Sequence, residues 1–447
     1  MFKKHNVVKI LIADEFPSMN KGELAILQGM LQTFKVLNRQ TKVTVFSFHP
    51  NLDKTRYPED IYLINIPKNL HLIENVSERK DITVINGLIS IVQHFLFYLI
   101  YFAFGRISLK LFKGSLWRAY LECDVIITCH DQESVLIGPK TLPFLPLYLT
   151  FLTRSLKKLL VIYGNGTNKF KRKIWEKLAA YVLKNVNLVT VRERVTLSYL
   201  KNIVGQNSNI FLTGDPAFLL PPASFESVRE IMKNENLKRR QNDNLLVGIT
   251  LPQSILTSFL STFNHINKEE AIQLYAKLLD SIVERHKAVI AFLPHCIGDN
   301  IYKDDRILAK EIFARCKNKH KIVVINSEYS ADELKGLIGV CDIVIGGRVH
   351  SIIGAVSMCT PSITIARPND SRVSGILGEM MNQREWIYDC YDKDLKGLYL
   401  KIDKLISLRR EISKKLEYQS QIVRELALAN GRLFGEVLSR QCQTKEQ

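Results

Sequence analysis

The sequence predicts an α/β protein with two Rossmann-like domains, a central cleft between them and a C-terminal helical tail. Two series of short apolar runs, separated by helical or polar stretches, support this prediction, because alternating strands and helices favour a covered parallel sheet. The proline-rich turn 216–222 and the polar stretch 233–244 separate the two series. We therefore expect an N-terminal domain over 1–222, a C-terminal domain over 244–394 and helices over 395–447.

Each predicted element follows from a local pattern of residues. In the first series we expect strands at 7–13, 43–48, 124–128, 159–163, 188–191 and 210–212, with an amphipathic helix over 24–37. In the second series we expect strands at 246–250, 288–293, 322–325, 342–345 and 362–365. Helices are expected between those strands at 269–285, 304–316 and 331–340.

Composition narrows the functional classes. The 447 residues are 46% hydrophobic and 24% charged, as is typical of a globular chain. A net charge of +18 favours an anionic partner, although many basic residues can simply solvate helix faces. No recognised nucleic-acid module is present, so we expect no nucleic-acid partner. None of the eight cysteines forms a CxxC pair, which argues against a metal site and fits a reduced, cytoplasmic compartment.

One apolar segment, 88–104, raises the question of a membrane. It is slightly short for a membrane span, and Gln93 and His94 interrupt it. The basic residues Arg106, Lys110 and Lys113 follow it, a pattern that favours an interfacial helix on anionic lipid at the inner face of the plasma membrane. Burial in the first domain, burial in a dimer interface and a true span stay open as alternatives.

The most informative stretch runs from the predicted strand 342–345 into the turn Gly346–Gly347. Arg348 and His350 follow at once, where a helix is expected to begin. Ligands of open α/β sheets bind at the carboxyl ends of strands, and a helix N-terminus favours anions. This pattern predicts an anion site with a proton donor beside it, whereas a structural histidine is the alternative.

Other candidates also follow predicted strands. Arg192 ends the strand 188–191, with a surface ion pair to Glu193 as the alternative interpretation. Asp215 precedes a proline, a common feature of plain turns. Gly164 lies in a glycine-rich loop after the strand 159–163, where it would permit close approach of a ligand. The stretch 295–305 contains metal-ligand residue types, but its spacing matches no zinc pattern.

Together these motifs resemble the polysaccharide pyruvyl transferase family over about residues 7–385. The resemblance rests on an N-x-G-[DE] turn, a V-R-[ED] strand end with a later serine, a D-P-A-F segment, a D-D pair and an R-x-H-[SA] block that ends in proline. The matching residues are Asn20 to Glu23, Val191 to Glu193 with Ser198, Asp215 to Phe218, Asp304 with Asp305, and Arg348, His350, Ser351, Ala355 and Pro361.

The resemblance implies a GT-B-like fold and the transfer of a carboxyethylidene group from phosphoenolpyruvate to a sugar. The acceptor would belong to a cell-surface polysaccharide or its lipid-linked precursor, and no cofactor would be needed. His350 would be the general acid, with Arg348 and Arg192 holding phosphate or carboxylate. The substrate-binding residues implied are Asn20, Gly22, Glu23, Gly164, Asp215, Gly347, Arg367 and Arg372.

Two positions depart from the family pattern. Arg372, with Arg367 nearby, stands where the family usually has a lysine, and Cys129 to Gln132 replaces a Gly-Gly turn. Two other functional classes also stay open. One is a GT-B glycosyltransferase that uses a nucleotide sugar, and the other is a non-catalytic protein that binds a membrane surface.

Overall fold

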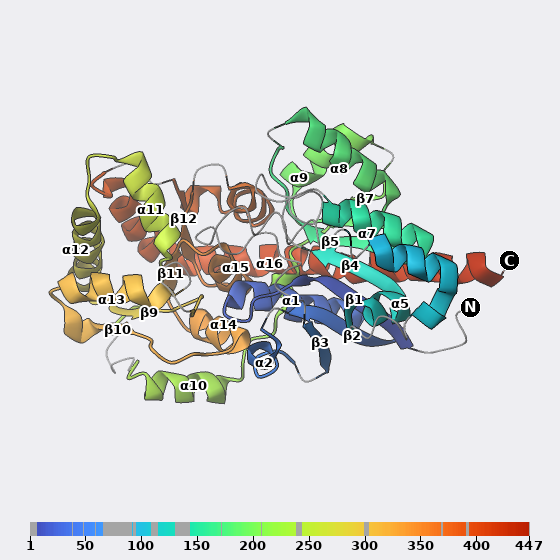
Figure 1. Cartoon of the computed structure of the whole chain (residues 1–447). Coiled ribbons are helices and arrows are strands. Elements are labelled where there is room, and N and C mark those ends of the chain that lie inside the picture. Colours follow the sequence, from blue (N-terminus) through green and yellow to red (C-terminus); the bar gives the residue numbers. More distant parts are fainter. Residues whose placement is uncertain are drawn as a thin grey trace. The chain divides into compact units, whose positions relative to one another are not determined.

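The computed structural model describes most of the chain (Figure 1). The described residues are 7–37, 39–47, 49–58, 60–65, 92, 95–108, 115–129, 144–170, 172–206, 208–237, 244–298, 304–367, 370–389 and 393–446. Several predicted features therefore lie outside the described residues: the loop after Cys129, the start of the apolar segment at 88–91, and the basic residues Lys110 and Lys113.

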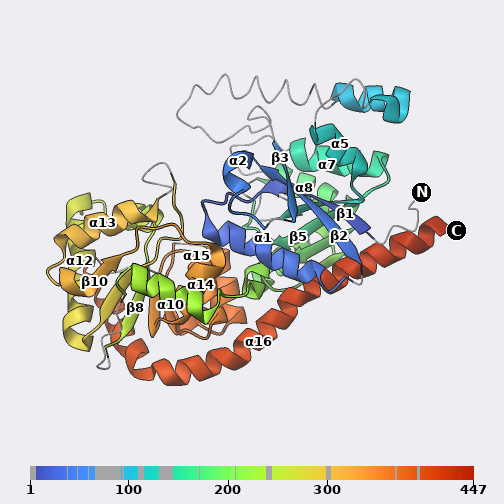
Figure 2. The same cartoon turned by 90° about the horizontal axis from the view of Figure 1, so that it is seen from below.

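The chain divides into two compact units. Unit 1 takes Met1–Pro17, Thr33–Gly214 and Leu428–Gln447, and unit 2 takes Ser18–Gln32 and Asp215–Ala427. This division differs from the predicted limits of 222 and 244, because two long helices each contribute residues to both units. The helices are α1 (Lys21–Phe34) and α16 (Lys396–Glu446), and α16 continues for 51 residues (Figure 2).

Unit 1 is built on a seven-stranded sheet with the order β3-β2-β1-β4-β5-β6-β7, and every neighbouring pair is parallel. Its strands are β1 (Val7–Glu15), β2 (Gln40–Ser47), β3 (Ile61–Asn65), β4 (Val125–Cys129), β5 (Leu159–Asn165), β6 (Leu188–Val191) and β7 (Ile210–Leu212). Its helices include α2 (Pro50–Asp53), α5 (Ser115–Glu122), α7 (Phe144–Ser155), α8 (Lys173–Asn185) and α9 (Arg194–Val204). Strands β4 and β5 are buried along their whole length, as expected for parallel strands with two covered faces.

Unit 2 repeats this plan with a six-stranded parallel sheet in the order β10-β9-β8-β11-β12-β13. Its strands are β8 (Leu246–Thr250), β9 (Val289–Phe292), β10 (Ile322–Val324), β11 (Ile343–Gly346), β12 (Ser362–Ile365) and β13 (Ile387–Tyr388). In both sheets the strand order reverses at one place, and in unit 2 that place lies between β8 and β11. Ligands of doubly wound sheets bind outside the carboxyl ends of the strands at such a reversal.

The helices of unit 2 form two groups that pack among themselves, as helices on opposite faces of one sheet do (Figure 1). One group is α11 (Gln253–Thr262), α12 (Lys268–His286) and α13 (Asp305–Arg315). The other is α10 (Phe225–Asn234), α14 (Ala331–Gly339) and α15 (Val349–Ser357). Two of these helices begin with a capping box, at Asn267 and at Ser330, which fixes their first residues.

The predicted fold class is confirmed: each unit is a parallel α/β sheet of the Rossmann type, and a long C-terminal helix follows. Strands β6, β7, β8 and β12 begin and end at the predicted residues. Two strands were not predicted, β3 and β13, which lie at the edges of the two sheets. Strand β13 has only two residues, whereas β3 is a mostly apolar run of five residues that the sequence could have indicated. The central cleft between the two domains stays a prediction.

The apolar segment forms a helix over 95–104 whose two sides differ. Phe97 is fully buried and stacks on Trp117 of α5, with 3.9 Å between ring centroids. Five apolar side chains on the same stretch are exposed: Phe95, Leu96, Leu99, Phe102 and Phe104. Within the described part of the chain, no helix has both the length and the apolar character that crossing a membrane requires.

Candidate functional site

The candidate site lies in unit 2, where β8 and β11 end side by side at the reversal of strand order. Thr250 ends β8, and its hydroxyl lies 2.6 Å from the hydroxyl of Ser351 in the first turn of α15. Arg348 is the N-cap residue of α15, and His350 is the second residue of that helix. The predicted positions of Arg348 and His350, directly after a buried strand and at a helix N-terminus, are therefore confirmed. We call the residues grouped around them the His350 cluster: Lys21, Gly22, Asp215, His295, Asp305, Arg348 and His350.

Asp305 connects two parts of this cluster. Its carboxylate accepts hydrogen bonds from Arg348 Nη2 at 2.6 Å and Nε at 3.3 Å. It also accepts the backbone N–H groups of His295 at 3.0 Å and Cys296 at 2.9 Å. Burial alone would lower the pKa of Arg348, but the Asp305 carboxylate holds it above its ordinary value. Asp305 therefore fixes both the guanidinium of Arg348 and the loop after β9.

The N-terminal turn also belongs to this cluster. Asn20 forms an antiparallel bridge with Cys296, and the backbone N–H of Lys21 donates to the carbonyl of His295 at 2.9 Å. The Asn20 side chain caps the start of α1 by accepting the N–H of Gly22 at 3.1 Å. The first residues of α1 are thus fixed against the loop that follows β9.

Gly22 lies directly against His350. A Cβ atom at position 22 would stand 2.8 Å from both Cβ and Nδ1 of His350, closer than real Cβ contacts allow. A glycine is therefore required here for the approach of the imidazole. The predicted substrate-binding turn thus contacts the predicted general acid through Gly22.

Carboxylates also face two other basic side chains of the cluster, Lys21 and His350. The ammonium group of Lys21, which is 1% exposed, donates to Glu328 at 2.6 Å and to the carbonyl of Ser18 at 3.1 Å. The Nε2 atom of His350 lies 3.7 Å from the fully buried carboxylate of Asp215, too far for a hydrogen bond. Asp215 itself caps the short helix η3 (Pro216–Leu219). The predicted residue Asp215 therefore lies beside the imidazole of His350.

His295 is a residue of the cluster that the sequence did not single out. It is 6% exposed, and neither ring nitrogen has a hydrogen-bond partner among the described residues. Burial first, then the charges of His350, Arg348 and Lys21, lower the pKa of His295 to about 3. One signal could have identified it: His295 follows the carboxyl end of β9 as His350 follows that of β11.

The other predicted residues of unit 2 lie along the same edge of the sheet or near it. Gly347 has a packing explanation, because a Cβ there would stand 2.2 Å from Ile255 of α11. Arg372 and Arg367 follow β12 and both pair with Asp370, at 2.9 Å and 3.2 Å. Burial would raise the pKa of Asp370, but its two arginine partners hold the pKa at about 2. These cations are therefore fixed by a shared carboxylate.

Arg192 and Gly164 belong to unit 1. Arg192 is 1% exposed, so its interpretation as a surface ion pair is wrong. A Cβ at Gly166 would stand 2.8 Å from its Nε atom, which shows that the guanidinium lies on the glycine-rich loop after β5. Gly164 has a φ of +59°, a conformation that favours glycine, and donates its N–H to Thr190. The role implied for Arg192, holding phosphate or carboxylate together with Arg348, stays a prediction.

Glu193 and Glu23 are the acidic residues that end the V-R-[ED] and N-x-G-[DE] motifs. The Glu193 carboxylate caps α9 by accepting the N–H of Thr196, and burial raises its pKa. The side chain of Glu23, in the first turn of α1, is near enough to Cys296 to act on the pKa of that thiol, which burial raises to about 12.

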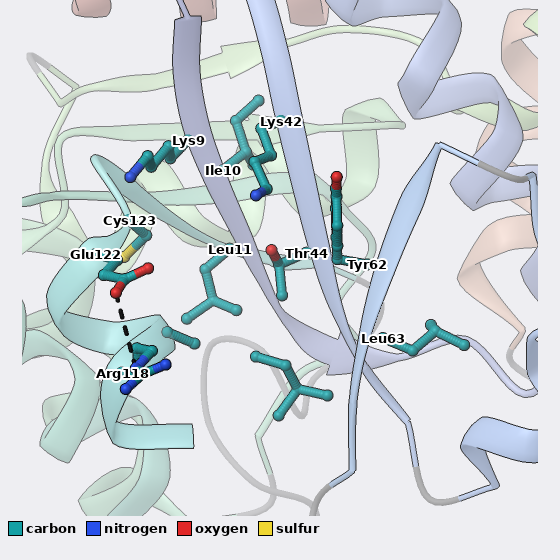
Figure 3. A pocket seen from close by; sticks show the side chains of 12 residues that line it. Lys9, Ile10, Leu11, Lys42, Thr44, Tyr62, Leu63, Arg118, Glu122 and Cys123 are labelled. Carbon is teal, nitrogen blue, oxygen red and sulfur yellow. Dashed lines mark ion pairs between the residues drawn. The ribbon is translucent and has the colours of Figure 1, made fainter. Parts of the chain in front are cut away.

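A separate hollow of about 370 Å³ opens on the sheet of unit 1 beside α5 (Figure 3). Lys42 stands 4.1 Å from the centre of the Tyr62 ring, and Arg118 pairs with Glu122 at 3.8 Å. Lys9 and Lys42 lie near the amino ends of β1 and β2, away from the edge where parallel sheets bind ligands. None of the predicted site residues lines this hollow.

Among the residues that the structure describes, no group of three or more His, Cys, Asp or Glu side chains is arranged to hold a metal ion. The side chains of the His350 cluster offer hydrogen bonds and positive charge from Arg348 and a group for proton transfer at the imidazole of His350.

Comparison with known proteins gives three kinds of result. Residues 20–369 match the family model described as polysaccharide pyruvyl transferase. The chain is 24% identical over 371 residues to the amylovoran biosynthesis protein AmsJ of Erwinia amylovora. This alignment covers 80% of this chain and 83% of AmsJ. The residues that match the family model, 20–369, include every residue of the His350 cluster.

Solved structures extend the fold comparison. A UDP-N-acetylglucosamine 2-epimerase aligns with a TM-score of 0.57 at 12% identity, covering 100% of this chain and 98% of that one. The UDP-GlcNAc 2-epimerase of Neisseria meningitidis gives 0.54 at 10% identity, covering 97% and 100%. HepE of Anabaena in complex with UDP gives 0.52 at 12% identity, covering 97% and 99%. At these identities the likeness establishes a GT-B-like fold and nothing about ligands.

Proposed function

The chain belongs to the polysaccharide pyruvyl transferase family, and we propose that it moves a carboxyethylidene group from phosphoenolpyruvate to a sugar. The acceptor is a sugar of a cell-surface polysaccharide or of its lipid-linked precursor. The observation that carries the proposal is the pair Arg348 and His350 at the N-terminus of α15, fixed by Asp305 and Gly22. A relative described as an amylovoran biosynthesis protein supports a polysaccharide acceptor.

The reaction needs one proton donor and a site for two anionic groups. A proton added to the methylene carbon of phosphoenolpyruvate makes a methyl group and leaves an oxocarbenium-like centre at the neighbouring carbon. One sugar hydroxyl attacks that carbon, phosphate leaves, and a second hydroxyl closes the ketal. Of the two hydroxyl protons released, one restores the proton donor and the other ends on the phosphate. No metal or organic cofactor enters this balance.

The residues of unit 2 suit these tasks. His350 supplies the proton, since its imidazole lies on the first turn of α15 beside the carboxylate of Asp215. Arg348 grips phosphate or carboxylate, because Asp305 occupies only Nε and Nη2 of its guanidinium. The N–H groups at the start of α15 favour an anion at the same place, and the side chain of the N-cap residue Arg348 makes no capping hydrogen bond to them. Arg192 of unit 1 is the further cation that we assign to the donor.

Product analysis tests the proposal. The chain is incubated with phosphoenolpyruvate and candidate cell-envelope glycans, and released phosphate and the mass of the glycan product are measured. His350→Gln should lower turnover roughly 10²- to 10⁴-fold while donor binding persists. Binding of UDP-sugars but not phosphoenolpyruvate, measured by calorimetry, would instead favour a GT-B glycosyltransferase that uses a nucleotide sugar. Binding of neither donor, with retained lipid binding, would favour a non-catalytic membrane-surface protein.

We further propose that unit 1 docks on anionic lipid at the inner face of the plasma membrane through the helix 95–104. Support comes from its exposed apolar side chains, among which Phe102 is 80% exposed and Phe95 56% exposed. The net charge of +18 adds attraction to acidic lipid. Phe97, stacked on Trp117, fixes the opposite side of the helix to unit 1.

Cosedimentation with acidic vesicles tests this location. The double variant Leu99→Glu with Phe102→Glu should lose binding, whereas Phe225→Glu, at an exposed phenylalanine of unit 2, should not. Binding should weaken as salt rises, because lipid charge is screened. If the protein stays in the supernatant at low salt, or self-associates through the same residues, the membrane proposal fails.

A further inference from the structure

The imidazole of His295 occupies an unusual position in the His350 cluster. Its backbone is fixed on both sides, because its N–H donates to Asp305 at 3.0 Å and its carbonyl accepts from Lys21 at 2.9 Å. Its ring is buried, and neither ring nitrogen finds a hydrogen-bond partner among the described residues. Buried polar groups are nearly always hydrogen-bonded, so each exception needs an explanation.

We propose that His295 is a further donor-site residue, whose neutral imidazole donates a hydrogen bond to the phosphate or carboxylate of the donor beside Arg348. This inference rests on the proposed function, and it adds a residue that the sequence motifs did not include. It also explains why the backbone of His295 is fixed on both sides while its ring nitrogens have no hydrogen-bond partner in the part of the chain that the structure describes.

The charges around His295 favour an anion as its partner. Lys21, Arg348 and His350 all act on it electrostatically, and together with burial they lower its pKa to about 3. The ring is therefore neutral near neutral pH and carries one N–H donor and one acceptor nitrogen. An acceptor oxygen that also carries negative charge would satisfy the donor and would be attracted by the same cations. A neutral ligand would gain only the first of these two effects.

A structural explanation makes a different prediction. If His295 only filled space, its two buried nitrogens without hydrogen bonds would destabilise the free protein, and a ring without polar atoms would give a more stable protein. His295→Phe keeps a flat ring and removes both nitrogens, so it should melt at or above the wild-type temperature. His295→Asn keeps an amide N–H close to the position of the Nδ1 atom.

Calorimetric titration at pH 7.5 compares the wild type, His295→Phe, His295→Asn and the control His286→Asn. His286 is a suitable control because it is a histidine of the same unit that already has a partner, Asp403, at 2.8 Å. The probes are phosphoenolpyruvate, inorganic phosphate and pyruvate. We expect Kd for phosphoenolpyruvate to rise about 10- to 100-fold in His295→Phe, to recover partly in His295→Asn, and to stay unchanged in His286→Asn.

The three probes separate the possible results. A matching loss of phosphate affinity assigns His295 to the phosphate, and a loss of pyruvate affinity assigns it to the carboxylate. If the wild type binds phosphate but not phosphoenolpyruvate, and His295→Phe loses phosphate, the anion role stands while the proposed donor fails. Unchanged affinity in His295→Phe overturns the proposal. So does equal weakening in both variants with lowered melting temperatures, and so does a wild type that binds none of the probes.

Discussion

Substitution of Gly22 by alanine tests the geometry of the site most directly. The added Cβ would stand 2.8 Å from His350 Cβ and Nδ1, whereas carbon atoms in contact ordinarily lie about 3.5–4.0 Å apart. Rotation of the imidazole cannot relieve the clash, because the Cβ atom of His350 moves only with the backbone of α15. One of the two segments must therefore shift by roughly 0.7 Å.

Both segments resist that shift. Lys21 is hydrogen-bonded to His295 through its backbone, and Ser351 is hydrogen-bonded to Thr250. A misplacement approaching 1 Å costs on the order of 10²-fold in turnover, and overpacking of this kind costs about 1–3 kcal/mol of stability. Phosphate release from phosphoenolpyruvate in the presence of an acceptor glycan measures the first effect, and urea unfolding measures the second.

A matched control lies on α15, the helix that contains His350. A Cβ at Gly354 of α15 would meet only Ile338, at an ordinary 3.6 Å. Gly354→Ala should therefore keep full turnover and gain about 0.5–1 kcal/mol of stability from the better helix former. If Gly22→Ala turned over within twofold of the wild type and unfolded at the same urea concentration, the assigned contact between Gly22 and His350 would be refuted.

Three further predictions follow from named contacts. Asp305→Asn should weaken phosphoenolpyruvate binding and cost about 3 kcal/mol of stability, because it removes the charge that orients Arg348. Asp304→Asn should leave donor affinity intact, since Asp304 caps α13 and pairs with Arg306; equal donor affinities of the two variants in calorimetry would contradict this. Gly166→Ala should lower turnover by displacing Arg192, with the far-ultraviolet circular dichroism unchanged; normal turnover would remove Arg192 from the site. The pKa of His295 in the native state lies below its ordinary 6.5, so below pH 6.5 the unfolded chain binds a proton that the native state does not. The wild type therefore loses stability as pH falls from 6.5 towards 3. Between pH 7.5 and pH 5 the free energy of unfolding in urea should therefore fall by about 2 kcal/mol more for the wild type than for His295→Phe. Parallel pH profiles of the two proteins would disprove the buried, neutral imidazole.

The elements that the sequence predicted share one property: their signal is local. Strand β8 and strand β12 are apolar runs that end at a proline or a polar turn, and their limits could be predicted to the residue. Arg348 and His350 could be predicted because Gly346 and Gly347 mark the end of a buried strand directly before them. Strand β13 has two residues at the sheet edge, and a pattern of two residues carries no periodicity.

The contacts of the His350 cluster, in contrast, join segments that are far apart in the chain. Gly22 reaches His350, and Asp305 reaches Arg348, only because loops return to the same sheet edge. No local pattern specifies those returns. For His295 the spacing of metal-ligand residue types in 295–305 carries no signal, whereas its position after the carboxyl end of β9 does.

Ion pairs hold the basic side chains of the His350 cluster in place. Lys21 is paired with Glu328, Arg348 with Asp305, and the carboxylate of Asp215 faces His350. These pairs balance the buried charge of the free protein, which lowers the cost of burying each cation and fixes its direction before a donor arrives. A bound donor anion then adds negative charge that the paired groups cannot neutralise without separating. His350 is the residue to which we assign the proton, and its Nε2 atom, 3.7 Å from Asp215, has no hydrogen-bond partner among the described residues. In the proposed reaction the imidazole of His350 can therefore give its proton to the methylene carbon while Arg348, paired with Asp305, holds the donor.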